Sequence, residues 1–402
     1  MKAKKEPWCR FRHRVVSVLL RPVVWLLCWL KYGISPERFR QQGKRAYLIL
    51  YNHQTPLDQF FVGLSFRRPV YYLATEDIFS MGWVSKLISW LVAPIPIAKA
   101  TGDMAAVKTC IRVAREGGTI AIAPEGNRTY SGRTGHMADS IAPLARKLGL
   151  PIALYRIEGG YGVEPRWSDK PRRGRMRSYV SRVMEPEEYA AWTDAELFAQ
   201  IKDGLFVDEG CDNVRYRSKR RAEFLERAMY VCPRCGLSEL ESEGNRIRCR
   251  RCGLTAEYGE DKRLTAIGAD FPYPYVGQWY DAQCDFVRRL DPAEYRAQPA
   301  FTDTVQLYEV ALRKNKTLLR SGARMALYGD RITIDENAAS ALALPFDELT
   351  AAAVLGRNKL NLYTRETVYQ ITGSKRFNAL KYVNFYYHYQ NRGNANGEFL
   401  GL

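Results

Sequence analysis

Residues 47–58, YLILYNHQTPLD, join a short apolar run to a polar turn. A run of this kind is typical of a buried parallel strand that ends in a loop. The pattern recurs at 118–123 (GTIAIA), before a polar loop at 124–135, and at 151–157, after a helical stretch at 139–147. Strands that alternate with helices predict an α/β layer fold, in which site residues gather on the loops at the carboxyl ends of the strands.

The first of these loops holds a histidine, His53, with a carboxylate, Asp58, five residues later. A carboxylate beside one imidazole nitrogen fixes the tautomer, so the other nitrogen is free to take a proton from a hydroxyl. The pair is therefore a candidate general base for attack on an acyl carbon. A purely structural histidine is the alternative, although the other three histidines of the chain stand in no comparable setting.

A second polar loop, residues 123–129 (APEGNRT), follows the next strand. In it Gly126 lets a ligand approach the backbone, and Arg128 can hold a phosphate with two parallel hydrogen bonds. Lys99 follows another apolar stretch, residues 77–98, and is a candidate second phosphate contact. That stretch is broken by two prolines, and it could line an acyl groove or join a membrane-facing surface. A solvated turn and a solvent-facing lysine are the alternatives.

The order and spacing of these motifs resemble the glycerolipid acyltransferases that acylate lysophosphatidic acid, the 1-acyl-sn-glycerol-3-phosphate acyltransferase type. The matching pieces are NHxxxxD, a Pro-Ile-x-basic segment, PEGxR and a Leu-Pro-Ile strand start at 150–152, within about residues 20–200. The resemblance implies an α/β acyltransferase domain with a mixed sheet and helices. It also implies transfer of a fatty acyl group from acyl carrier protein or coenzyme A to a lysophospholipid hydroxyl, with no cofactor required for catalysis.

Carried over by position, the resemblance makes His53 the general base and Asp58 its orienting carboxylate. It implies a substrate-binding site of six further residues: Asn52, Lys99, Glu125, Gly126, Asn127 and Arg128. The last of these and Lys99 would hold the acceptor phosphate. The sequence departs from the family pattern at Lys99, where arginine is usual, and at Ala123 and Asn127, where phenylalanine and threonine are usual.

The net charge of +18 predicts a phosphate-bearing partner: nucleic acid, an anionic membrane surface or an acidic carrier protein. Residues 1–45 hold twelve basic and two acidic side chains around an apolar run at 15–30, VVSVLLRPVVWLLCWL. This run is shorter than the roughly 20 residues that span a bilayer, so we expect residues 1–45 to anchor the protein peripherally at the cytoplasmic face of a membrane, where Arg21 could snorkel. An ordinary buried helix and a cleaved signal peptide are the alternatives, but no small-x-small cleavage site follows Leu30. Because the charge lies beside the anchor, we expect no nucleic-acid partner.

Four of the nine cysteines form two CxxC pairs, Cys232 with Cys235 and Cys249 with Cys252, separated by thirteen residues. Four thiolates from two tight turns supply closed tetrahedral coordination for zinc. The spacing resembles a zinc ribbon and predicts a structural zinc module at 230–256, with redox pairing of the cysteines as the alternative. The other five cysteines are scattered singly, which is typical of reduced thiols in the cytosol.

The remaining boundaries follow from changes in composition. We expect an acyltransferase domain at 46–205, a basic helical linker at 206–229 and a second linker at 257–300. Residues 301–402 alternate apolar and polar residues between turn signals and end with helical spacing, which predicts a β-rich domain with a C-terminal helix. This region resembles pleckstrin-homology and GRAM modules, which often bind membranes or proteins.

Two classes of function remain open from the sequence. The first is an O-acyltransferase that makes phosphatidic acid in phospholipid biosynthesis, or that acts on another lyso-acceptor or on glycerol-3-phosphate. The second is a non-catalytic adaptor on a lipid surface, which would use the zinc and β-rich modules to recruit partners. The presence of His53, Asp58, Glu125 and Arg128 together favours the enzyme.

Overall fold

The computed structural model describes residues 6–75, 78–79, 82–97, 103–212, 214–310, 316–392 and 399–401. The chain forms two compact units, which are described separately. Unit 1 comprises residues 1–129, 133–163 and 173–209, and unit 2 comprises residues 130–132, 164–172 and 210–402.

Unit 1 is built on a six-stranded sheet in the order β3-β2-β4-β1-β5-β6. Its strands are β1 (Leu48–Tyr51), β2 (Val70–Thr75), β3 (Ile95–Ile97), β4 (Thr119–Ile122), β5 (Ile152–Glu158) and β6 (Arg177–Met184). Neighbouring strands run parallel except β5 and β6, which are antiparallel, so the predicted mixed sheet is confirmed. Every residue of β1 and β4 is buried, as is typical of strands that are covered on both faces.

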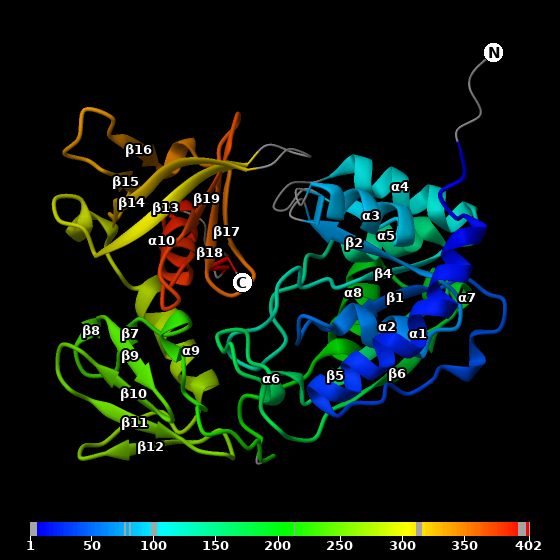
Figure 1. Cartoon of the computed structure of the whole chain (residues 1–402), viewed down its shortest axis with the longest axis horizontal. Coiled ribbons are helices and arrows are strands. Elements are labelled where there is room, and N and C mark those ends of the chain that lie inside the picture. Colours follow the sequence, from blue (N-terminus) through cyan, green and yellow to red (C-terminus); the bar gives the residue numbers. More distant parts are fainter. Residues whose placement is uncertain are drawn as a thin grey trace. The chain divides into compact units, whose positions relative to one another are not determined.

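Helices connect these strands and pack along the sheet (Figure 1). They are α2 (Asp58–Ser65), α3 (Trp83–Val92), α4 (Met104–Arg115), α5 (Ile141–Leu148), α6 (Gly160–Val163), α7 (Pro186–Ala190), α8 (Asp194–Leu205) and the short 3-10 helix η1 (Arg40–Gln42). The α4 helix contacts β3 and β4, while α8 contacts β1 and β5. The predicted helix at 139–147 corresponds to α5.

Helix α1 (Phe11–Tyr32) contains the N-terminal apolar run and is longer than that run. It contacts α2 and α3, and most of its apolar side chains remain exposed. By length and composition alone, this 22-residue helix could cross a membrane. The guanidinium of Arg21 donates hydrogen bonds to the carbonyl oxygens of Leu64 (2.9 Å) and Phe66 (2.6 Å) at the end of α2. The last carbonyls of a helix lack intrahelical partners and attract a cation.

Unit 2 begins with small antiparallel sheets around the four paired cysteines. The strands are β7 (Val231–Cys232), β8 (Gly236–Leu237), β9 (Leu240–Glu243), β10 (Arg246–Cys249), β11 (Thr255–Tyr258) and β12 (Leu264–Ile267), followed by α9 (Val276–Arg288) and the 3-10 helix η4 (Pro292–Tyr295). The stretch 257–300 is therefore not a linker, because it contains the end of β11, β12 and α9. From α9, Trp279 and Val287 are buried in the core of unit 2.

The helix predicted within 206–229 is also wrong, since the described part of this stretch contains only a short 3-10 helix, η3 (Leu225–Arg227). Its backbone instead bonds to turns of the small sheets: Ala222 N–H donates to the Gly244 carbonyl between β9 and β10 at 2.9 Å, and Tyr216 N–H to the Glu260 carbonyl between β11 and β12 at 2.7 Å. These tertiary hydrogen bonds override a helical side-chain pattern, because helix propensity is worth only fractions of a kcal/mol per residue.

The C-terminal part of unit 2 is a seven-stranded antiparallel sheet in the order β16-β15-β14-β13-β19-β18-β17. The strands are β13 (Phe301–Val310), β14 (Thr317–Leu327), β15 (Arg331–Ile334), β16 (Leu342–Pro345), β17 (Ala351–Leu355), β18 (Lys359–Tyr363) and β19 (Val368–Thr372), with η5 (Phe346–Glu348) between β16 and β17. Helix α10 (Leu380–Gln390) packs against β17 and β18 (Figure 1). The β-rich domain with a C-terminal helix is confirmed, while its likeness to pleckstrin-homology or GRAM modules stays a prediction.

Candidate functional site

Three neighbouring strands of unit 1 bring the predicted site loops together. Strand β1 lies between β4 and β5, and all three run parallel. Parallel strands end at the same edge of a sheet. The loop after β1 with His53, the loop after β4 with Glu125, and α6 after β5 therefore meet at this edge.

His53 and Asp58 form the predicted pair. The Nδ1 atom of His53 lies 2.8 Å from Oδ2 of Asp58, which is the first residue of α2. The Asp58 side chain is fully buried, whereas a quarter of the His53 side chain is exposed. With Nδ1 committed to the carboxylate, Nε2 is the imidazole nitrogen left to accept a proton from a substrate.

The carboxylate of Asp58 is held in place by its own turn. Its Oδ2 accepts the backbone N–H of Gln54 at 2.6 Å, and its Oδ1 accepts the Thr55 backbone N–H at 2.9 Å and the Thr55 hydroxyl at 2.7 Å. A buried carboxylate is tolerated when hydrogen bonds satisfy it, and the start of a helix favours negative charge. Asp58 is therefore fixed in place, as an orienting partner of an imidazole must be.

Glu125 links two loops of the site. Its Oε1 accepts the backbone N–H of His53 at 2.8 Å, and its Oε2 accepts the backbone N–H of Gly135 at 2.6 Å. Burial raises the pKa of Glu125 to about 7, against the lowering effect of these two N–H donors. Because both carboxylate oxygens are engaged by backbone groups, we infer that Glu125 shapes the site rather than holding a substrate.

Asn52 likewise holds the fold. Its side chain is fully buried, Nδ2 donates to the Ile157 carbonyl at 2.8 Å, and Oδ1 accepts the Ile157 backbone N–H at 2.8 Å. These bonds continue the pairing of β1 with β5 beyond the end of β1. We therefore infer that Asn52 positions the turn that carries His53.

The remaining predicted residues lie on the loop after β4. Gly126 forms a tight turn with a positive φ of 62°, and its N–H donates to the Ala123 carbonyl at 3.0 Å. A side chain at this position would be strained, so glycine is required. Asn127 is half-buried and Arg128 is buried in the same loop, three residues after Glu125. Lys99 falls outside the residues that the structure describes.

Two neighbours of the motif were missed by sequence reasoning. Thr55 binds Asp58 through both its backbone N–H and its hydroxyl, and a threonine three residues before a helical carboxylate could have signalled this turn. Gln54 is 1% exposed, and neither atom of its amide has a hydrogen-bond partner among the described residues. An added Cβ at Gly160 of α6 would lie 2.5 Å from the Cβ of Gln54, so α6 packs directly on the turn between β1 and α2 that carries His53.

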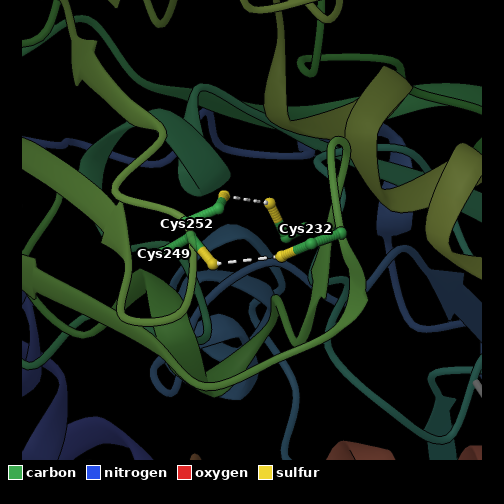
Figure 2. A group of neighbouring side chains, drawn as sticks. Cys232, Cys249 and Cys252 are labelled. Atoms are coloured by element: carbon green, nitrogen blue, oxygen red, sulfur yellow. Dashed lines mark hydrogen bonds between the residues drawn. The ribbon is translucent and has the colours of Figure 1, made fainter.

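The four predicted metal ligands converge in unit 2. The sulfur atoms of Cys232, Cys235, Cys249 and Cys252 all lie within 4.8 Å of one another. Figure 2 shows Cys249 and Cys252 facing Cys232 from the opposite loop. The Sγ atoms of Cys232 and Cys252 are 3.6 Å apart, as are those of Cys235 and Cys249. Tetrahedral zinc with zinc–sulfur bonds near 2.3 Å needs sulfur atoms about 3.8 Å apart, so this arrangement fits the ion.

Outer groups support thiolates at this centre. The backbone N–H of Arg234 donates to Sγ of Cys232 at 3.4 Å, and the hydroxyl of Ser238 lies 3.2 Å from Sγ of Cys235. Donors of this kind stabilise the negative charge of coordinated sulfur. Four protein ligands leave no position for a substrate, so a metal here would be structural.

Comparisons with known proteins find a similarity within unit 1. Residues 34–156 match the model of the family described as Acyltransferase, a range that includes His53, Asp58, Glu125 and Arg128. The chain is 25% identical over 121 residues to a curated protein of Brassica napus named 1-acyl-sn-glycerol-3-phosphate acyltransferase BAT2, chloroplastic. That match covers 29% of this chain and 34% of the relative, so the chain spans about a third of the length of the relative.

One solved structure that resembles the chain is the 1-acyl-sn-glycerophosphate (LPA) acyltransferase PlsC from Thermotoga maritima. The sequences are 18% identical, the match covers 49% of this chain and 80% of the other, and the TM-score is 0.40. The family match lies in the part of the chain where the sequence motifs predict an acyltransferase domain.

Proposed function

We propose that this protein, with its acyltransferase domain, is a membrane-surface O-acyltransferase that converts 1-acyl-glycerol-3-phosphate to phosphatidic acid. The acyl donor would be a thioester of acyl carrier protein or coenzyme A. The observation that carries the proposal is the contact between His53 and the fully buried Asp58, at the sheet edge where parallel strands end. The curated relative in Brassica napus is named for this substrate.

The geometry supports a direct transfer from donor to acceptor, without an acyl-enzyme. Nε2 of His53 takes the proton from the free hydroxyl of the acceptor as its oxygen attacks the thioester carbonyl. The tetrahedral intermediate then expels the thiolate, which receives the proton from the imidazolium. Asp58 stabilises that imidazolium through its 2.8 Å contact with Nδ1. Neither an acyl-enzyme nor a metal takes part in these steps.

The loop after β4 is the proposed acceptor site. Arg128 would bind the phosphate with two parallel hydrogen bonds, and Lys99 would add a second cation. Gly126 allows the phosphate to approach the backbone. Asn127 is assigned to the same site because it lies between Gly126 and Arg128 in the loop.

Helices α1 and α3 are the proposed membrane-facing surface. Large apolar side chains of α1 are exposed, among them Leu19 (67%) and Leu30 (68%), and Trp83 (74%) of α3 is exposed as well. Single exposed apolar residues are ordinary on soluble proteins, but a helix face lined with them marks an interaction surface. Because α1 is also held against α2 through Arg21, we propose that it lies in the interface of an anionic membrane, at its cytoplasmic face, instead of crossing it.

The test is transfer of a labelled acyl group to lysophosphatidic acid in vesicles, with acyl carrier protein and coenzyme A donors offered separately. His53→Ala is compared with the wild type, and His388→Gln, in unit 2, is the matched control. Loss of the general base is expected to lower turnover by about 10²- to 10⁴-fold, while the control stays near wild type.

Near-normal turnover of His53→Ala would remove this histidine from the mechanism. Transfer only to another lyso-acceptor or to glycerol-3-phosphate would correct the substrate and keep the reaction. Silence with every acceptor, from a folded protein, would favour the non-catalytic adaptor.

A further inference from the structure

Two short segments of the acyltransferase region belong to unit 2 instead of unit 1: residues 130–132 and 164–172. The first follows the proposed phosphate loop, and the second follows α6. A domain limited to 46–205 would have kept both segments with the sheet of unit 1. Their contacts show that unit 2 is built around them.

Tyr130 is the main contact of the first segment. It is 2% exposed and is part of the hydrophobic core of unit 2. Its hydroxyl donates to the backbone carbonyl of Arg357, in the turn between β17 and β18, at 2.8 Å. The guanidinium of Arg166 lies 4.6 Å from the centre of its ring. Next along the chain, the Ser131 carbonyl lies so close to α9 that an added Cβ at Gly277 would be 3.2 Å from it.

The second segment is held by the same turn. Arg166 donates to the carbonyls of Val354 at 2.8 Å and Gly356 at 2.9 Å, and Arg357 forms an ion pair with the fully buried Glu164. Trp167 is fully buried and packs edge-on against Tyr258 with ring centres 5.9 Å apart.

Arg227 then fixes the chain beyond Trp167. It binds Asp169 with two hydrogen bonds, at 2.7 Å and 3.1 Å, and is itself 2% exposed. A bidentate pair of this kind fixes geometry as well as contributing stability. Both segments are therefore immobilised within unit 2.

Each immobilised segment adjoins a site element along the chain. Tyr130 comes two residues after Arg128, the proposed phosphate ligand. Glu164 directly follows α6, whose Gly160 packs on Gln54 and next to Thr55 in the catalytic turn. A residue fixed two positions away restricts the backbone of Arg128, because only a few dihedral angles separate them.

We propose that Tyr130 is a positioning residue for acyl transfer, by which the C-terminal unit fixes the loop that carries Arg128. The anchor of Tyr130 is the β17–β18 turn, and its effect reaches Arg128 through the chain itself. The expected effect of Tyr130 on acceptor binding rests on the proposed function. Its expected effect on the order of the loop rests on the fold alone.

The test compares Tyr130→Phe with Tyr386→Phe in the full chain. Both variants keep the aromatic ring and remove one buried hydroxyl that donates to a backbone carbonyl, that of Arg357 for Tyr130 and that of Leu349 at 3.0 Å for Tyr386. The two should therefore lose similar thermal stability. Only Tyr130 adjoins the proposed phosphate loop.

Tyr130→Phe is expected to raise the KM for lysophosphatidic acid about three- to tenfold, the size of one lost hydrogen bond, with little change in kcat. It should also speed hydrogen–deuterium exchange of the amides at 125–129. Tyr386→Phe should change neither quantity.

Equal behaviour of the two variants would overturn the proposal, because Tyr130 would then be only a core residue. Faster exchange without a change in KM would also overturn it, since the loop would not control acceptor binding. If the wild type transfers to no acceptor, the proposed function fails, while unchanged exchange at 125–129 would separately reject the positioning role.

Discussion

Asp58 has one task at the residue scale: it accepts hydrogen bonds from His53, Gln54 and Thr55 at once. Asp58→Asn places an amide N–H group where one of these donors points, so the imidazole loses its fixed tautomer. We expect a fall in turnover of about 10²- to 10⁴-fold in the acyl-transfer assay. The control is Asp203→Asn, which changes an exposed aspartate of α8. Equal activity of the two variants would contradict the orienting role of Asp58.

Glu125 predicts a pH dependence of stability. Its pKa is raised by burial to about 7 in the folded protein, so folding favours its protonated form. The stabilisation is fully present below the unfolded pKa near 4.5 and is lost as the pH rises through 7.

The free energy of unfolding of the wild type should therefore fall as the pH rises from 4.5 to 7. The variant Glu125→Gln, which has no titrating group at this position, should show a fall that is smaller by on the order of 2 kcal/mol. Denaturant unfolding at several pH values measures this difference. Parallel curves for the two proteins would show that Glu125 is already ionised across this range.

Sequence could predict the contact between His53 and Asp58 but not every role around it. His53 and Asp58 follow an apolar strand at a spacing that one turn can close, which is a local property. Asn52 binds Ile157, which lies 105 residues away along the chain, so its structural role depends on the pairing of β1 with β5. Arg21 is the same case, because its partners are carbonyls of α2 that no pattern near residue 21 reveals.

The exposed face of α1 predicts membrane binding at the element scale. Leu19 and Val23 are 67% and 63% exposed, so charged replacements there should leave the fold intact. The double variant Leu19→Glu/Val23→Glu is expected to lose most co-sedimentation with anionic vesicles, because each buried aliphatic side chain contributes ~1.5 kcal/mol or more. Leu318→Glu, at an exposed leucine of β14, is the control. Unchanged binding of the double variant would place the membrane contact elsewhere.

Elements with a strong apolar pattern were predictable, and elements fixed by tertiary bonds were not. Strands β1, β4 and β5 each contain a run of buried, mostly apolar residues, which is typical of buried parallel strands. The stretch 206–229 has a helical pattern of charges, but the backbone N–H groups of Ala222 and Tyr216 donate to carbonyls of distant turns, at residues 244 and 260. Sequence spacing alone does not show that competing partner.

For the molecule as a whole, the four converging cysteine thiols predict one bound zinc ion per chain. The purified chain should contain about one zinc per chain, and Cys249→Ser should lose it together with thermal stability. Cys211→Ser, an exposed single cysteine, should keep both. Metal analysis and thermal unfolding test this, and a folded wild type without metal would contradict the site.

The division into units was the least predictable feature at this scale. Composition changes near residue 205 suggested that one domain ends where the next begins. The chain in fact enters unit 2 at Tyr130 and again at Glu164 before returning for good at Gly210. Such a division depends on which segments share a core, and Trp167 shares the core of unit 2 across a long sequence separation.

This interleaving has a consequence for how the protein is made. Arg166 finds its carbonyl partner at Gly356 only after 190 further residues have been synthesised. At about 5–20 residues per second, a ribosome needs roughly 10–40 s for that length. Throughout that interval Trp167, fully buried in the finished protein, has no completed core to enter. Residues 164–172 therefore cannot complete their packing until the β17–β18 turn has been synthesised.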